Sequence, residues 1–187
     1  MKKTITTLLL TILTTFAFGQ IDDILMKANW KTGMEKIIFG NTIFRHEGKN
    51  DIGGMLNVGF QTFAQVKADL EQKADKQMWT PEKKKQTIES YARFAGGGMI
   101  HLYLTRLTIA AANTDMFTVI VKDSTDSYEI LREDLKRSVP NTPFSGSSYW
   151  WNYTAIPIPD KINGKVYIYI IDQLGGDNNK FKFEVKL

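Results

Sequence analysis

The chain has 187 residues, of which 43% are hydrophobic and 24% are charged, as expected for one folded domain or for a compact domain with a small appendage. Its 24 basic and 20 acidic side chains are too evenly balanced to indicate a nucleic-acid-binding protein. The complete lack of cysteine excludes disulfides, thiolate metal sites and thiol catalysis.

The first segment has the layout of a secretory signal peptide. A basic start at Lys2 and Lys3 precedes an apolar run around residues 8–13, and the small residues Ala17 and Gly19 precede a cut before Gln20. The run is too short and too rich in threonine for the ~20 apolar residues that span a bilayer. We therefore predict a signal peptide at residues 1–19, an exported protein (periplasmic or extracellular), and no stable membrane span once the leader is removed. Loss of the leader's two lysines leaves 24 − 2 = 22 basic against 20 acidic residues.

Residues 20–97 are predicted to form a mainly helical N-terminal region. Residues 21–36 are interpreted as a short helix or an irregular lead-in. Residues 36–45 place Gly40-Asn41 between two apolar clusters, which is typical of a small hairpin, and residues 46–54 have loop composition.

Two helices should follow. Over residues 62–77, apolar side chains recur at helical spacing and leave one buried stripe. A second helix is predicted from the Thr80 cap and Pro81 in the first turn through to Phe94. The glycines of residues 96–98 should end it, and the main boundary of the chain is placed there.

Beyond that boundary, residues 98–187 change to strand-type sequence. Two β-type runs, residues 99–109 and 116–122, flank a polar turn at residues 113–115, so they are predicted to form a central hairpin. Further strands are predicted at residues 128–135, 150–158, 165–171 and 180–185. The last alternates strictly and should lie at a sheet edge with one wet face. The predicted fold class is α+β, with an N-terminal helical layer packed on a C-terminal antiparallel β-sandwich of about six strands.

No motif names a reaction, a cofactor or a metal. The two histidines, His46 and His101, lack zinc-site spacing, and the nucleophile elbow of serine hydrolases is absent. Two pairs of aspartates, Asp123 with Asp126 and Asp172 with Asp177, fall in predicted turns. They lack EF-hand spacing, and aspartates in turns commonly bond their own backbone. We therefore predict no catalytic residue, no metal ligand and no cofactor.

Aromatic side chains form the one candidate site. Trp150 shares its strand face with Ile156 and Ile158, which sends it into the core and sends its neighbours to the opposite face. The same parity applies to the strands around residues 101 and 167. The resulting candidate ligand-binding residues are Tyr149, Trp151, Tyr153, Tyr103, His101, Tyr167 and Tyr169.

If these strands share one sheet, its outer face is a field of rings with polar tips. We expect the N-terminal helices to cover this face, because their apolar stripe needs a partner surface. The leading functional expectation is an exported, non-catalytic binding module for a glycan or another envelope protein. The alternatives are a carboxylate-dependent hydrolase of envelope or extracellular polymers and a structural subunit of an envelope assembly.

Overall fold

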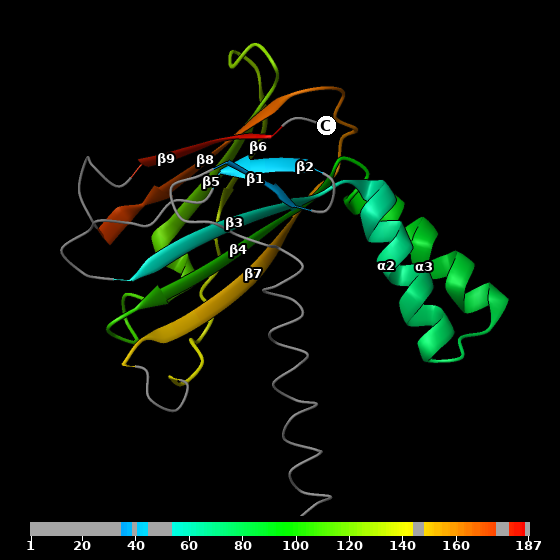
Figure 1. Ribbon diagram of the computed structural model, residues 1–187, viewed down its shortest axis with the longest axis horizontal. Coiled ribbons are helices and arrows are strands. Elements are labelled where there is room, and N and C mark those ends of the chain that lie inside the picture. Colours follow the sequence, from blue (N-terminus) through cyan, green and yellow to red (C-terminus); the bar gives the residue numbers. More distant parts are fainter. Residues whose placement is uncertain (1–34, 39–40, 45–53, 144–147, 175–179, 186–187) are drawn as a thin grey trace, which may run out of the picture.

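The computed structural model describes residues 35–38, 41–44, 54–143, 148–174 and 180–185. Two antiparallel sheets pack face to face as a sandwich, and a pair of helices extends from one end of it (Figure 1). A separate two-stranded sheet pairs β1 (Glu35–Ile38) with β2 (Asn41–Phe44). The predicted α+β class, with a helical part and an antiparallel sandwich, is confirmed.

The first layer is a three-stranded sheet in the order β3-β4-β7. Its strands are β3 (Met55–Gln61), β4 (Gly98–Arg106) and β7 (Trp150–Ile158). The second layer is a four-stranded sheet in the order β6-β5-β8-β9. Its strands are β6 (Glu129–Asp134), β5 (Phe117–Lys122), β8 (Val166–Asp172) and β9 (Lys180–Val185). A short 3-10 turn, η1 (Thr114–Met116), leads into β5.

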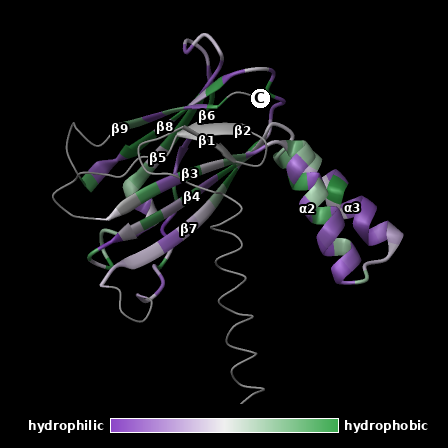
Figure 2. Ribbon diagram, in the orientation of Figure 1, coloured by the Kyte–Doolittle hydropathy of each residue, from purple (hydrophilic) through white to green (hydrophobic). Residues whose placement is uncertain are grey.

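The core lies between the two layers. Along β4 and β8 every second residue is buried, as a strand with one face in a core requires. Leu102 of the first layer and Ile168 of the second are both fully buried in one apolar cluster. In Figure 2 the helix pair is coloured mostly as hydrophilic, so the apolar core belongs to the sandwich.

Arg106 and Asp172 join the two layers at one end of this core. Neither side chain is exposed, and the Arg106 guanidinium donates to the Asp172 carboxylate across 2.8 Å. Arg106 also donates to the backbone oxygen of Thr105 and lies 5.6 Å from the ring centre of Phe117. Asp172 was predicted to lie in a turn, and that prediction is wrong: it ends β8 facing inward.

The predicted central hairpin is also wrong. The two runs are strands β4 and β5, but they belong to different sheets. The segment between them crosses from one layer to the other, and its residues Ala111 and Ala112 are buried. Asn152 of β7 donates to the backbone oxygens of Ala112 and Ser138, which holds this crossing in place. Neither strand lies at an edge: β4 is the central strand of the three-stranded sheet, and β5 is an inner strand of the four-stranded sheet.

Strand β3 lies in residues 20–97, which were predicted to be mainly helical, between the predicted loop and the first of the two predicted helices. Its inward residues Leu56, Val58 and Phe60 are fully buried, and it pairs along its whole length with β4. The three-stranded sheet therefore includes residues from both sides of the boundary at Gly98. The small hairpin around Gly40-Asn41 is confirmed by the pairing of β1 with β2, and β9 is confirmed as an edge strand.

The two predicted helices are present as α2 (Phe63–Lys76) and α3 (Pro81–Phe94). Thr62 and Gln65 form a capping box at the start of α2, and Thr80 caps α3. The buried residues of α2 are Val66, Leu70 and Ala74, whereas α3 has none. Helix α2 packs on α3 and on the ends of β3 and β4.

The prediction that the helices cover the aromatic outer face is wrong. Figure 1 shows the pair standing beside the end of the sandwich, and Tyr153 on that outer face is 41% exposed. The apolar stripe of α2 finds its partners in α3 and in the strand ends instead. Among the described residues, no helix is long and apolar enough to cross a membrane.

Candidate binding face

Four of the seven predicted residues lie together on the outer face of the three-stranded sheet. They are His101 and Tyr103 of β4 with Trp151 and Tyr153 of β7, and we call them the aromatic face. Antiparallel register places Tyr103 directly opposite Tyr153, and Trp151 opposite Thr105. Their inward neighbours on β4, Leu102 and Leu104, are fully buried, so the predicted parity is confirmed.

The rings of the aromatic face contact one another. The ring centres of Tyr103 and Trp151 are 6.0 Å apart with the planes tilted by 32°. His101 stacks near Tyr153 at the same centre distance, with 19° between the planes. Tyr153 is 41% exposed and the other three are half-buried. Partial burial raises the pKa of Tyr103 and Tyr153, so both keep a hydroxyl proton at neutral pH.

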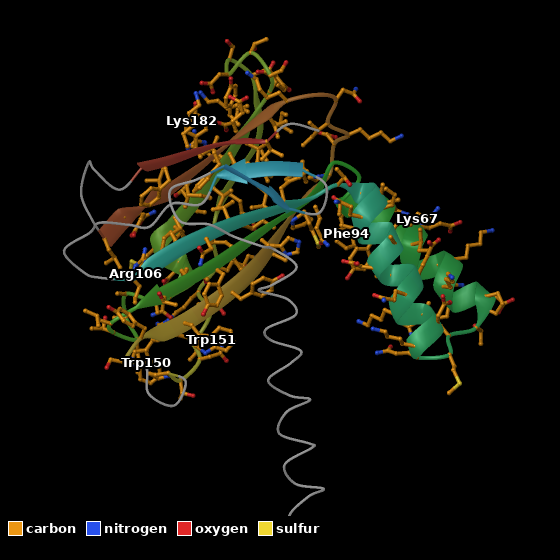
Figure 3. All side chains as sticks on the ribbon, in the orientation of Figure 1. Lys67, Phe94, Arg106, Trp150, Trp151 and Lys182 are labelled. Atoms are coloured by element: carbon orange, nitrogen blue, oxygen red, sulfur yellow. The ribbon has the colours of Figure 1, made fainter. Side chains whose placement is uncertain are left out.

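Trp150 and Trp151 begin β7 at the end of the sheet farthest from the helices (Figure 3). Trp150 packs against the core, as predicted, and Trp151 lies on the outer side. The backbone of Trp151 exchanges two hydrogen bonds with Asn141, which steadies this end of the strand. Tyr149 precedes β7 and is 39% exposed.

A line of polar contacts links the aromatic face to helix α2. The Tyr153 hydroxyl lies 2.6 Å from Nδ1 of His101, and Nε2 of His101 lies 2.8 Å from Oε1 of Gln61. Nε2 of Gln61 in turn donates to the Asp69 carboxylate across 2.7 Å. Burial lowers the pKa of His101 from 6.5 to about 4, although the nearby Asp69 charge opposes the shift. His101 is therefore neutral at physiological pH.

The other two predicted rings, Tyr167 and Tyr169, lie on the opposite side of the molecule. Strand β8 belongs to the four-stranded sheet, so the premise that all these strands share one sheet is wrong. The rings point outward there, as their parity predicted, because Val166, Ile168 and Ile170 face the core. The candidate residues thus form two separate surfaces.

Tyr167 and Tyr169 lie in a network of charged side chains. Asp126 accepts from the Tyr169 hydroxyl and from Nζ of Lys182, each at 2.6 Å. The Lys182 ammonium lies 4.2 Å from the ring centre of Tyr167. These hydrogen bonds lower the pKa of Asp126 and raise that of Lys182. The ionic groups of this surface are largely satisfied by one another.

The acidic turn around Asp123 behaves as expected for a structural turn. Its carboxylate accepts from the backbone N–H groups of Thr125, Ser127 and Tyr128. Among the residues that the structure describes, no three His, Asp or Glu side chains gather as they would around a metal ion.

Sequence reasoning missed Gln61 and Asp69. Gln61 is the outward residue that follows the alternating Leu56, Val58 and Phe60, so recognising β3 would have placed it beside His101. Asp69 depends on the position of the helix, which no local pattern fixes. Neither a protein-family profile, nor a curated protein sequence, nor a solved structure matches this chain.

Proposed function

We propose that the protein is an exported, non-catalytic binding module that holds a glycan on its aromatic face. The observation that carries this proposal is the group of paired rings on one face of the sandwich, where Tyr153 is 41% exposed. Large aromatic surfaces seldom remain in water without a partner.

The chemistry of the four side chains suits a sugar. Aromatic rings offer apolar faces to the C–H groups of a pyranose, and the hydroxyl or ring nitrogen at their tips bonds to its hydroxyls. Tyr and Trp have few rotatable bonds, so ordering them on binding costs little entropy. Contact with a neighbour in each pair, Tyr103 with Trp151 and His101 with Tyr153, holds the rings in place before a ligand arrives.

Export is a separate part of the proposal. It rests on the leader pattern of residues 1–19, which lie outside the described residues. Intact-mass measurement on protein purified from its native host should give a chain that begins at Gln20. Recovery of a chain that still begins at Met1 would contradict export.

Binding is tested by sedimentation with insoluble polysaccharides, namely cellulose, chitin and peptidoglycan. We expect the wild-type protein to bind at least one of them, and Trp151→Ala to weaken that binding about tenfold through loss of ring stacking and burial. Tyr167→Ala is the matched control, because it removes a similar ring from the opposite sheet. Equal loss in both variants would contradict a site on the aromatic face.

Two outcomes would replace this proposal. Capture of an envelope protein, with no polysaccharide bound, would favour the structural-subunit alternative. Release of soluble sugar fragments from any of the polymers would favour the hydrolase alternative.

A further inference from the structure

The line of contacts from Asp69 to Tyr153 has only one consistent hydrogen-bond direction. An ionised carboxylate only accepts, so the Gln61 group that faces Asp69 is the amide NH₂. The Gln61 carbonyl oxygen then faces His101 and needs a donor, which fixes the proton of the neutral imidazole on Nε2. Nδ1 is left without a proton and accepts from the Tyr153 hydroxyl.

The direction of this chain decides what Tyr153 offers to a ligand. Its only proton is committed to His101, so the phenol oxygen presents lone pairs to the solvent side. A ligand that places a hydroxyl donor there gains a hydrogen bond. A ligand that places a carboxylate there sets one hydrogen-bond acceptor against another, because the phenol oxygen has no proton left to donate. The Asp69 carboxylate, whose charge acts on His101, adds a second negative group to this end of the face.

We infer that the chain Asp69–Gln61–His101–Tyr153 makes the Tyr153 end of the aromatic face selective for an uncharged, hydroxyl-donating sugar over an acidic one. This inference rests on the proposed glycan-binding function and deepens it. Asp69 is then a positioning residue: it lies on α2, acts through Gln61 and His101, and contacts no ligand at Tyr153. Gln61 is suited to the relay because it is only 6% exposed, which protects its two hydrogen bonds from competition with water.

The direction of the chain is tested without any ligand. Nitrogen-15 NMR at pH 7 on a His46→Gln variant leaves a single imidazole, that of His101. We expect the shifts of the neutral tautomer that carries its proton on Nε2, and a mixture of tautomers in Asp69→Ala. A proton found on Nδ1 in the His46→Gln protein would overturn the inference and would leave the glycan-binding proposal intact.

Selectivity is tested by calorimetry with three soluble hexasaccharides: cellohexaose, chitohexaose and hexagalacturonate. We expect a neutral oligosaccharide to bind and the acidic one to bind at least tenfold more weakly. Tyr153→Phe should weaken the neutral ligand about threefold to tenfold, the net value of one hydrogen bond. Tyr167→Phe, which removes a hydroxyl from the opposite sheet, should change its affinity by less than about twofold.

Variants on α2 separate positioning from a general structural effect. Asp69→Ala should weaken the neutral ligand about threefold, and Asp69→Asn should restore it, because its amide oxygen still accepts from Gln61. Glu71→Ala removes a carboxylate from the same helix and should have no effect. Wild-type affinity in Asp69→Ala, or equal binding of the acidic hexamer, would overturn the inference. Failure of the wild-type protein to bind any glycan, here or in sedimentation, would overturn the proposed function as well.

Discussion

Arg106 and Asp172 lie inside the core, although charged side chains normally stay in contact with water. Both are charged and fully buried, and they bridge β4 of one layer and β8 of the other. Replacing one partner leaves an uncompensated charge in the core. Arg106→Met should therefore lower the free energy of unfolding by about 3–5 kcal/mol. The double variant Arg106→Met with Asp172→Leu should recover most of that loss. Urea denaturation measures both, and a single variant that loses less than about 1 kcal/mol would contradict a buried pair.

His101 should make stability depend on pH. Its pKa in the folded protein is lowered from 6.5 to about 4, so the unfolded chain binds more protons between these values. The contribution of His101 to stability is present above pH 6.5 and is lost as the pH falls from 6.5 to about 4. The loss amounts to roughly 3 kcal/mol, at about 1.4 kcal/mol per pKa unit.

Carboxylates also titrate in acid, so His101→Gln is the comparison for this prediction. The difference in unfolding free energy between wild type and variant should shrink as the pH falls from 7 to 4. A difference that stays constant over this range would contradict a buried neutral imidazole.

At the scale of single elements, local signals predicted the helices and several strands well. The Thr80-Pro81 start fixes α3, and strict alternation fixes β9, because caps and side-chain period act over a few residues. The pairing of strands depends on long-range packing. The sequences of β4 and β5 resemble the two strands of one hairpin, yet the chain between them crosses to the other sheet. Burial of Ala112 and the hydrogen bond from Asn152 to its backbone oxygen stabilise this crossing. For the candidate site, parity predicted which rings face outward, but only the sheet order separates Tyr103 from Tyr169.

Gly98 joins the end of α3 to β4 and has a structural requirement that neighbouring sequence does not reveal. Its φ is +115°, and an added Cβ would lie 2.3 Å from the backbone oxygen of Gln61. Gly98→Ala should therefore cost about 2–3 kcal/mol of unfolding free energy, from strain plus the displaced β3 end. Gly164→Ala is the matched control: its φ is +76°, but no atom lies within 4 Å of the new Cβ. The control should lower the free energy of unfolding by about 1 kcal/mol, and thermal unfolding of both variants measures the difference. Equal costs would contradict a steric role for Gly98.

At the scale of the whole molecule, the sandwich and the helix pair contribute differently to stability. Nearly all of the apolar cluster lies between the two sheets, whereas α3 has no buried residue. The helix pair is also inserted between two strands that already pair, since Gln61 lies opposite Met99. The helix pair is therefore an insertion in the connection between the paired strands β3 and β4. The sandwich should fold without that insertion.

Replacing residues 62–97 with a short Asn-Gly turn tests this division of the molecule. The variant keeps all seven strands of the two layers, so cooperative unfolding should persist. We expect the free energy of unfolding to fall by about 2–5 kcal/mol, because the buried side chains of α2, Val66 and Leu70, and the contacts of α2 with β3 and β4 are lost. The variant also lacks Asp69, so its affinity for a neutral glycan should fall as it does in Asp69→Ala, while Trp151 remains in place. Thermal unfolding followed by near-ultraviolet circular dichroism measures the stability, and the signal of the Tyr103 and Trp151 pair should be retained. Calorimetry with the neutral hexasaccharide measures the affinity. A chain that does not fold would show that the helices are an integral part of the core, and full wild-type affinity would contradict the role of α2 in orienting Tyr153.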